Sequence, residues 1–275
     1  TLPASKSIPK EMFPILDKPV IQYIVEEAVQ SGITDIIFVT SGHKRAIEDY
    51  FDVNFEIEYR LSQKGKHDIK ERIHRLAEMA NFYSLRQPEP RGDGDAVLRG
   101  SALLNKGESC AVMWGDDVIF DPEPTLKKLI SVYDEFHAPA LALEEIPGKD
   151  VECYGVIAGS EVRQGLYKIS HIIEKPKLEE APSRLSIVGR YIMTPEIVEA
   201  LKNQTFAVDG EIRFSHAIRD AIPKITVYGY VFPGKRFDCG NKLGLLKANV
   251  YAGLRDPDIM DDFGRFLELN NKNAK

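Results

Sequence analysis

The chain has few of the residues on which disulfide scaffolds and structural zinc sites depend. Its 275 residues include three cysteines, Cys110, Cys153 and Cys239, at wide spacings and without a C-x-x-C pair. We therefore expect neither a disulfide framework nor a zinc site. We expect a reducing, cytoplasmic setting. Long hydrophobic runs are also absent, since none approaches the roughly 20 residues that a membrane-spanning helix needs. We expect no membrane association.

The chain also has no excess of basic residues. It carries 36 Lys and Arg against 42 Asp and Glu, which gives a formal net charge of −6. This balance argues against broad electrostatic binding to nucleic acid. It leaves open a local basic pocket for a phosphorylated small molecule. Hydrophobic residues make up 43% of the chain, which is ordinary for a globular core.

Short apolar segments alternate with amphipathic ones over the first 150 residues. Helices are expected at 19–32, 45–51, 62–78, 95–104 and 125–136, and strands at 36–40, 82–87, 110–114 and 138–143. This order predicts an α/β fold with a Rossmann-like, doubly wound, mostly parallel sheet and helices on both faces. Ligands bind at the carboxyl ends of such strands. The polar segments 87–94 and 115–117 should therefore share one rim.

The pattern changes after residue 150. Short β-like segments at 154–158, 166–173 and 185–193 are separated by Gly, Pro and charged residues, which favours a smaller antiparallel region. A helix should begin at Pro195, and a helical tail should complete the chain from 241 onwards. We expect a single domain over 1–275, made of segments 1–150, 151–240 and 241–275.

Each polar motif allows two interpretations when it is taken alone. Asp116 and Asp117 follow a strand and could hold Mg²⁺, or they could belong to a capped turn. Asp238, next to a glycine, has the same two readings. The pair Glu174 and Lys175 could be a surface ion pair.

The order of the motifs narrows the choice. They are Ser7–Pro19, Leu85–Gln87, Gly92–Leu98, Gly115–Asp117, Tyr154–Ile157, Ile173–Lys177, Ile187–Ile192, Gly210–Ile212 and Gly234–Gly244. This series resembles the sugar-phosphate nucleotidylyltransferases, and most closely the bacterial UTP–glucose-1-phosphate uridylyltransferase family, as far as about Leu254. Segments 7–19, 187–192 and 234–244 are the most similar.

The resemblance implies a reaction and its metal. The family joins UTP and glucose 1-phosphate into UDP-glucose and pyrophosphate with Mg²⁺, by in-line attack and without a covalent enzyme intermediate. Asp116 and Asp238 match the metal ligands, with Asp117 as a possible outer partner. Lys10 matches the lysine near the triphosphate, and Lys175 matches the one at the sugar phosphate. A homodimer or homotetramer is also implied.

The resemblance assigns the remaining residues to two subsites, a nucleotide-binding half (1–150) and a sugar-binding half (151–240), followed by C-terminal helices (241–275). Gln87, Gly92 and Asp116 match nucleotide-binding positions, and Gly155, Glu174, Lys175, Val188 and Gly189 match sugar-binding positions. From the residues themselves, Gln87 could equally be a surface amide and Val188 a core residue. Trp114 is interpreted as sheet core, and Cys239 as a packed small side chain.

Two features depart from the family pattern. The family begins with a buried strand and a Gly-rich phosphate loop that this chain does not show, so we expect about 15–20 residues upstream, with a strand between 36–40 and 110–114. The 275-residue chain alone should have little activity. Asp95 also stands where close relatives carry histidine. The alternatives are therefore a glucose-1-phosphate thymidylyltransferase-like enzyme and an inactive sugar-nucleotide-binding fragment.

Overall fold

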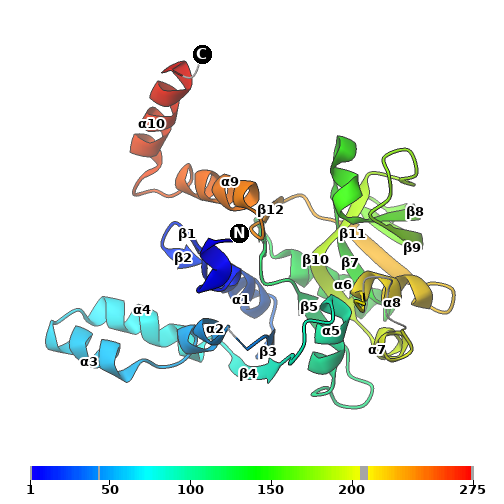
Figure 1. Cartoon of the computed structure of the whole chain (residues 1–275), viewed down its shortest axis with the longest axis horizontal. Coiled ribbons are helices and arrows are strands. Elements are labelled where there is room, and N and C mark those ends of the chain that lie inside the picture. The colour runs from blue at the N-terminus through cyan, green and yellow to red at the C-terminus, as the bar shows by residue number, and fades with distance from the viewer. Residues whose placement is uncertain (1, 43, 205–209, 274–275) are drawn as a thin grey trace.

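The computed structural model describes residues 2–42, 44–204 and 210–273. Figure 1 shows an α/β body, from which two helical elements project. One is the pair α3 (Phe55–Gln63) and α4 (His67–Glu78), and the other is the C-terminal helix α10 (Met260–Asn273). The chain starts with short elements: η1 (Ala4–Lys6), η2 (Lys10–Met12), β1 (Pro14–Ile15) and β2 (Lys18–Pro19).

The largest sheet has six strands in the order β5-β10-β7-β11-β9-β8. They are β5 (Cys110–Met113), β7 (Ala140–Glu145), β8 (Gly155–Arg163), β9 (Leu166–Glu174), β10 (Leu185–Met193) and β11 (Val227–Val231). The α/β class and the antiparallel region after residue 150 are confirmed. The sheet is mixed, because β11 pairs with β7 in parallel while the other pairings within it are antiparallel. The share of parallel pairing is thus lower than expected, for a topological reason: β10 returns from the β8–β9 hairpin and lies between β5 and β7, antiparallel to both.

A second, small sheet holds the first part of the expected fold. Strand β3 (Asp35–Thr40) pairs in parallel with β4 (Asn81–Arg86), and Thr40 stands opposite Arg86. The backbone N–H of Gln87 extends this pairing by donating to the Thr40 carbonyl at 2.8 Å. Among the described residues β3 and β5 are not paired with each other. The expected additional strand between them stays a prediction.

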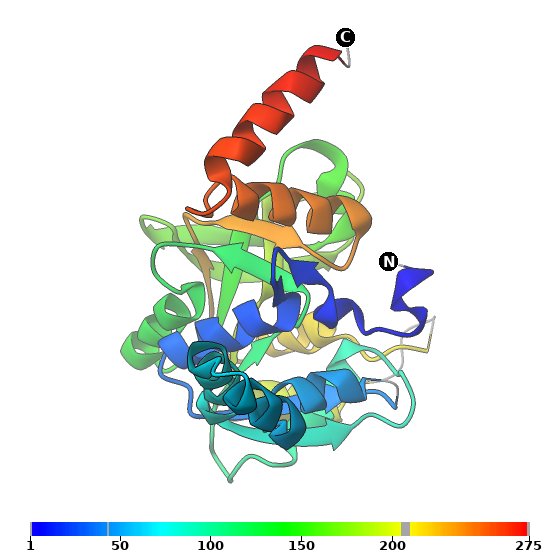
Figure 2. The ribbon, with the colours of Figure 1, turned by 90° about the vertical axis from the view of Figure 1, so that its left-hand side faces the viewer.

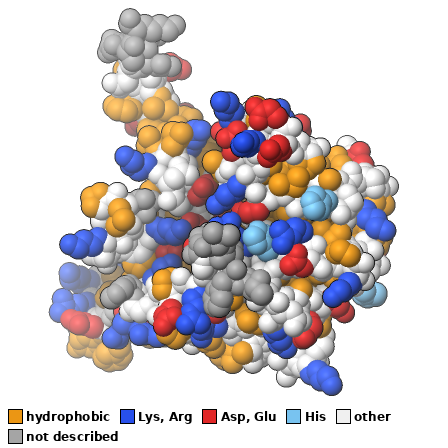
Figure 3. Space-filling model, turned by 45° about the vertical axis from the view of Figure 1, so that its right-hand side comes forward, with side chains coloured by type: hydrophobic (Ala, Val, Ile, Leu, Met, Phe, Trp, Pro, Cys, Tyr) orange, Lys and Arg blue, Asp and Glu red, His pale blue; other side chains and the backbone are white. Residues whose placement is uncertain are grey.

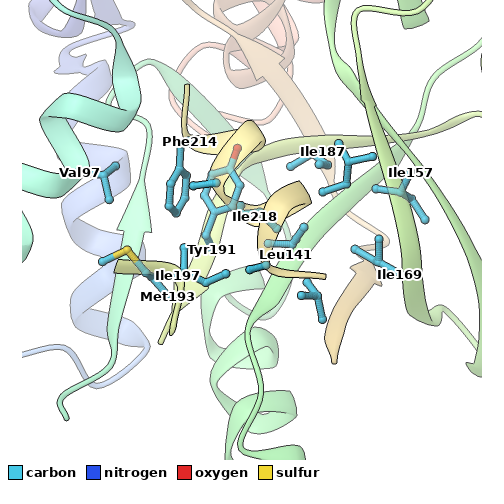
Figure 4. Close-up of a cluster of buried hydrophobic side chains, with 14 of the residues drawn as sticks. Val97, Leu141, Ile157, Ile169, Ile187, Tyr191, Met193, Ile197, Phe214 and Ile218 are labelled. Atoms are coloured by element: carbon cyan, nitrogen blue, oxygen red, sulfur yellow. The ribbon is translucent and has the colours of Figure 1, made fainter. Parts of the chain in front are cut away.

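Helices cover both faces of the large sheet, as predicted. Strand β7 alternates: Leu141 and Leu143 pack with α7 (Pro195–Lys202) and α8 (Phe214–Ala221), whereas Ala140 and Ala142 pack with α6 (Thr125–Phe136). Figure 4 shows the first of these clusters, in which Tyr191 and Phe214 lie beside Leu141. The helix α5 (Asp93–Ser101) joins α7 and α8, and α1 (Val20–Gln30) packs beside α6. Because successive strand residues face opposite sides, one short apolar strand supplies two cores.

Two features of the fold differ from the expected elements. The helix expected at 62–78 is α4, which begins later, at His67, because Gly65 adopts a left-handed φ of +66° between it and a preceding helix, α3, that was not expected. Strands β6 (Asp117–Phe120) and β12 (Lys235–Asp238) were not expected, and they pair with each other. The remaining elements are α2 (Arg45–Tyr50), η3 (Gly148–Cys153) and α9 (Lys242–Gly253).

The C-terminal helix projects from the body, and the surface carries charges of both signs. Figure 2 shows α10 extending away from the body beyond α9. Within the described part of the chain, no helix combines the length and apolarity that a bilayer crossing requires. On the face seen in Figure 3, Lys and Arg side chains are interspersed with Asp and Glu and do not form one continuous basic surface.

Candidate functional site

The pairing of β6 with β12 brings the two predicted metal ligands together. In its register Asp117 stands opposite Asp238, and the backbone N–H of Cys239 donates to the carbonyl oxygen of Asp116 at 2.8 Å. A Cβ atom on Gly240 would collide with Asp116 Oδ2 and lie 2.9 Å from Asp238 Oδ1. Both carboxylates therefore converge on the same side of Gly240. Their proximity was predicted, and their role as metal ligands stays a prediction.

Lys10 belongs to the same cluster. Its Nζ lies 2.5 Å from Asp116 Oδ2. Partial burial disfavours the charged amine, but the carboxylate of Asp116 outweighs that effect, with smaller contributions from Glu11 and Asp238, so the pKa of Lys10 lies above its usual value. The ammonium group is therefore a fixed positive charge beside the two aspartates. This position suits the predicted contact with a triphosphate.

The donor set of this cluster fits a magnesium ion. Asp116 and Asp238 supply two hard carboxylate oxygens. Within the described residues, no group of three or more His, Cys, Asp or Glu side chains is gathered as for a fully protein-bound metal. Mg²⁺ usually takes one or two carboxylates and completes its shell with water and substrate phosphates. A pair of aspartates without further protein ligands is thus the expected arrangement for a metal that arrives with a nucleotide.

Asp117 has a structural role that the sequence did not reveal. Its side chain is 4% exposed, and its Oδ1 accepts from Arg236 Nε at 2.5 Å while its Oδ2 accepts from the N–H of Gly189 at 2.8 Å. Burial raises the pKa of Asp117, and the two guanidinium groups of Arg236 and Arg190 oppose that shift. Asp117 therefore locks β6 to β10 and β12. Its neighbour Asp116 is left for the cluster with Lys10.

Arg236 extends this network toward the predicted sugar-binding half. A second nitrogen, Nη1, donates to Glu144 at 3.2 Å, and the guanidinium lies 4.9 Å from the ring centre of Tyr154. The main chain of Tyr154 in turn accepts from the N–H of Lys175 at 3.0 Å. A continuous set of contacts thus joins Asp117 to Lys175. Arg236 lies in a segment that resembles the family, but its charge alone gave no sign of burial.

A second buried ion pair, between Glu27 and Arg190, lies next to Asp117. Arg190 is 0% exposed and donates to Glu27 from both Nε (2.9 Å) and Nη2 (2.7 Å). It also donates to the carbonyl oxygens of Asp117 and Gly189, each at 2.8 Å. Glu27 accepts a further bond from the N–H of Leu126. This pair therefore ties α1 and α6 to the strands that carry the aspartates.

The predicted base-reading residues Gln87 and Gly92 do lie together. Gln87 Nε2 donates to the carbonyl of Gly92 at 3.1 Å and to Asp95 Oδ2 at 2.8 Å. Asp95 also accepts from Arg99 Nε at 2.9 Å. Burial acts to raise the pKa of Asp95, but these hydrogen bonds from Gln87 and Arg99 lower it below the usual value. The carboxylate of Asp95, which stands where close relatives carry histidine, is therefore bound by Gln87 and Arg99.

Gly92 is required for a different reason than the one expected. Its φ is +99°, and a Cβ atom there would collide with the carbonyl oxygen of Ile212. The next glycine, Gly94, donates its N–H to the same carbonyl at 2.9 Å. The space above Gly92 is therefore filled by the segment before α8. Its predicted contact with a base stays a prediction.

Glu174, Gly155 and Ser215 form a small polar cluster at the end of the β8–β9 hairpin. Gly155 stands opposite Glu174 in that hairpin, and a Cβ on the glycine would lie 3.1 Å from Glu174 Oε2. The hydroxyl of Ser215, from α8, donates to the same oxygen at 2.9 Å. Among the described residues the second oxygen, Oε1, accepts no hydrogen bond, and a carboxylate oxygen of this kind is suited to sugar hydroxyls. Ser215 gave no signal in the sequence.

Lys175 follows this cluster in an unusual conformation. Its φ of +49° lies in the left-handed region, which costs a non-glycine residue free energy. Pro176, which follows it, is buried, whereas the Lys175 side chain is exposed. The strained turn therefore holds the amine at the end of β9 and out of the core. This placement agrees with a contact to a ligand phosphate.

Two predicted sugar-binding residues serve packing. The side chain of Val188 is 2% exposed and belongs to the core on the α6 side, which favours the core interpretation of that residue. Its assignment to the sugar pocket, like that of Gly189, stays a prediction. A Cβ on Gly189 would lie 2.8 Å from Trp114 and from Asp117. Trp114 packs against Tyr191 and Phe214, which confirms it as sheet core.

Cys239 is a packed residue, as predicted. It is fully buried, and burial with the nearby carboxylates of Asp117, Asp116 and Asp238 raises the pKa of its thiol to about 12. At neutral pH it is therefore protonated. This protonation state is unsuited to a nucleophile.

Comparison with known proteins agrees with this geometry. A family model described as nucleotidyl transferase matches residues 2–252. The chain is 43% identical to a UTP–glucose-1-phosphate uridylyltransferase of Staphylococcus epidermidis, over 97% of this chain and 92% of that one. It is 44% identical to that of Streptococcus pneumoniae, over 97% and 90%. A solved UTP-bound UGPase from Acinetobacter baumannii superposes with a TM-score of 0.89 at 39% identity, covering 97% of this chain and 93% of that chain.

The family model thus covers nearly the whole chain. The matched range, residues 2–252, includes Lys10, Asp116, Asp238 and the β8–β9 hairpin. On this sequence and structural evidence, the chain belongs to the nucleotidyl transferase family.

Proposed function

We propose that this protein transfers a uridylyl group from UTP to glucose 1-phosphate, giving UDP-glucose and pyrophosphate. The observation that carries the proposal is the convergence of Asp116 and Asp238 beside Lys10. The contacts from Asp117 through Arg236 and Tyr154 to Lys175 connect that cluster to the sugar-binding half. The relatives named as uridylyltransferases support UTP and glucose 1-phosphate as the substrates.

In the proposed reaction a phosphate oxygen of glucose 1-phosphate attacks the α-phosphorus of UTP. The bond from that phosphorus to the oxygen bridging to the β-phosphate breaks, and pyrophosphate leaves with the electron pair. Lys10 neutralises triphosphate oxygens, and Lys175 holds the attacking sugar phosphate. Mg²⁺ held by Asp116 and Asp238 would supply further charge neutralisation on the phosphates. No side chain is required as a nucleophile.

In the proposed site Glu174 and Gly155 bind the sugar, and Gln87 binds the base. Glu174 accepts hydrogen bonds from glucose hydroxyls, with Gly155 allowing a close backbone approach. Gln87 reads the edge of the base. Uracil and thymine share the edge that one amide can read, so the glutamine does not by itself exclude dTTP. UTP is favoured because the relatives at 43–44% identity are named for it.

The test is pyrophosphate release by the full-length protein with glucose 1-phosphate, Mg²⁺ and either UTP or dTTP. We expect turnover with UTP. D116N and D238N should each lower kcat by about 100-fold or more, because each removes a carboxylate facing the transferring phosphates. D261N, in the projecting α10, is the matched control and should retain activity. Preference for dTTP would support a thymidylyltransferase, and nucleotide binding without pyrophosphate release would support a binding protein.

We also propose a homodimer or homotetramer in a reducing, cytoplasmic compartment. Large apolar side chains are exposed on both C-terminal helices, including Leu243 and Leu246 on α9 and Phe266 and Leu269 on α10. Surfaces of this kind are commonly covered in an assembly. The cysteines are free thiols. Light scattering of the purified protein under reducing conditions gives the mass of the particle, and a monomer at every concentration would exclude the assembly.

A further inference from the structure

The orientation of the Gln87 amide is fixed by two groups that can only accept hydrogen bonds. Its Nε2 donates to the Gly92 carbonyl at 3.1 Å and to the Asp95 carboxylate at 2.8 Å. An amide rotated by half a turn would direct Oε1 at both acceptors, which is repulsive. Both N–H bonds of the amide are thus engaged with the protein. Among the described residues, Oε1 accepts no hydrogen bond, so it is the atom left for a ligand.

Asp95 is itself held rigidly. It is 7% exposed, and the oxygen that binds Gln87 also accepts from Arg99, one helical turn further along α5. The two donors keep the pKa of Asp95 below its ordinary value, so the acceptor is a carboxylate at neutral pH. Neighbouring Asp93 fixes the start of the same helix by accepting from the N–H of Phe214 at 2.9 Å. The helix that carries Asp95 is therefore anchored at the end nearest Gln87.

We propose that Asp95 is a positioning residue that holds the Gln87 amide with Oε1 toward the nucleotide base, so that the site selects pyrimidines with an N3–H group over cytosine. This inference rests on the proposed function, since it takes Gln87 to be the base-reading residue. Uracil donates its N3–H to an acceptor, whereas cytosine presents a lone pair at N3. If Gln87 Oε1 cannot rotate away, it accepts a hydrogen bond from the N3–H of uracil and repels the N3 lone pair of cytosine.

The test compares the equilibrium binding of UTP and CTP by isothermal titration calorimetry. In D95N the new amide can either donate or accept, so the Gly92 carbonyl is the one remaining group of the pair that can only accept, and the rotated amide that presents Nε2 to the base becomes more populated. The ratio of UTP affinity to CTP affinity should then fall about tenfold, because a polar group that is no longer restricted discriminates poorly. Q87A should lose most of the preference. S101A, at the other end of the same helix, removes a hydroxyl that among the described residues bonds only the Leu98 carbonyl, and should keep the preference for UTP.

Each outcome decides a different point. An unchanged affinity ratio in folded D95N, with the preference lost in Q87A, would overturn the role of Asp95 and leave the base site intact. A full preference in Q87A would show that Gln87 does not read the base, and both the base site and this inference would fail. Thermal unfolding of each variant reports whether it folds. If D95N does not fold, D95S removes the same carboxylate in a smaller side chain and carries the same expectation.

Discussion

Asp238 stands directly opposite Asp117 in the antiparallel pairing of β12 with β6. This register directs the carboxylate of Asp117 into the core and leaves that of Asp116 beside Lys10. Two adjacent aspartates therefore have opposite tasks, one buried and structural, the other available to a ligand. The predictions below separate these tasks.

Gly240 should be essential to the arrangement of Asp116 and Asp238 although it has no functional group. In G240A the added methyl would press on Asp116 Oδ2 and Asp238 Oδ1 and drive the carboxylates apart. We expect kcat to fall by about tenfold or more, because displaced ligands lose transition-state stabilisation, with little change in secondary structure. G264A, where a Cβ would meet Leu254 no closer than 4.0 Å, is the control. Steady-state pyrophosphate release measures the effect, and equal activity in the two variants would contradict it.

Removal of the Arg236 side chain should destabilise the fold. R236M leaves Asp117 buried without its guanidinium partner, and breaking a buried pair in this way typically costs about 3–5 kcal/mol. R236K should recover part of the loss, because a lysine keeps the charge but lacks the planar guanidinium whose separate nitrogens bond Asp117 and Glu144. Urea-induced unfolding measures the difference. R265M, at an exposed ion pair of α10, should change the free energy of unfolding by less than about 1 kcal/mol.

The Glu27–Arg190 pair should show strong coupling in a double-mutant cycle. E27Q or R190M alone leaves one charge uncompensated in the core, at a cost of about 3–5 kcal/mol. The double variant should lose less than the sum of the two, because neither charge is then left alone. Arg190 also donates to two backbone carbonyls, so R190M should be the more damaging single change. Additive losses would show that the two side chains act independently.

Asp95 should make stability depend on acid pH. Its folded-state pKa is lowered, so its contribution is complete above the ordinary carboxyl pKa and is lost as pH falls through the lower folded value. The difference in Tm between the native chain and D95N should therefore stay nearly constant from about pH 7 to about pH 5 and shrink as the pH falls further, toward about pH 2. Thermal unfolding across that range measures it. A difference that is constant with pH would show that the carboxylate charge contributes nothing.

Local pattern was sufficient for most of the elements. Periodicity placed α1, β3 and α6 almost at their observed bounds. The candidate residues Asp116 and Asp238 came from the resemblance to a known family, because each motif taken alone allowed two interpretations. The pairing of β5 with β10, and not with a parallel neighbour, could not be predicted this way. A strand's own residues show that it is buried, but they do not show which distant strand lies beside it.

The buried polar network was missed for a related reason. Arg190 and Arg236 look like surface residues in the sequence, because arginine is rarely buried unless it is paired. Their partners, Glu27 and Asp117, lie far away along the chain and on other elements. The sidedness of Val188 was equally hidden, since both faces of β10 are covered and either face accepts an apolar residue.

Strand β12 lies near the end of the sequence, and this has a consequence for when the two carboxylates can come together during folding. Since β6 and β12 come from the middle and the last part of the sequence, their pairing spans more of the chain than any other strand pairing of the described residues, and such long-range pairings are slow to form. A nascent or partly folded polypeptide can hold a complete β3–β4 unit and still lack any paired carboxylates. Competence to engage a nucleotide should therefore appear in refolding only once β12 has paired with β6.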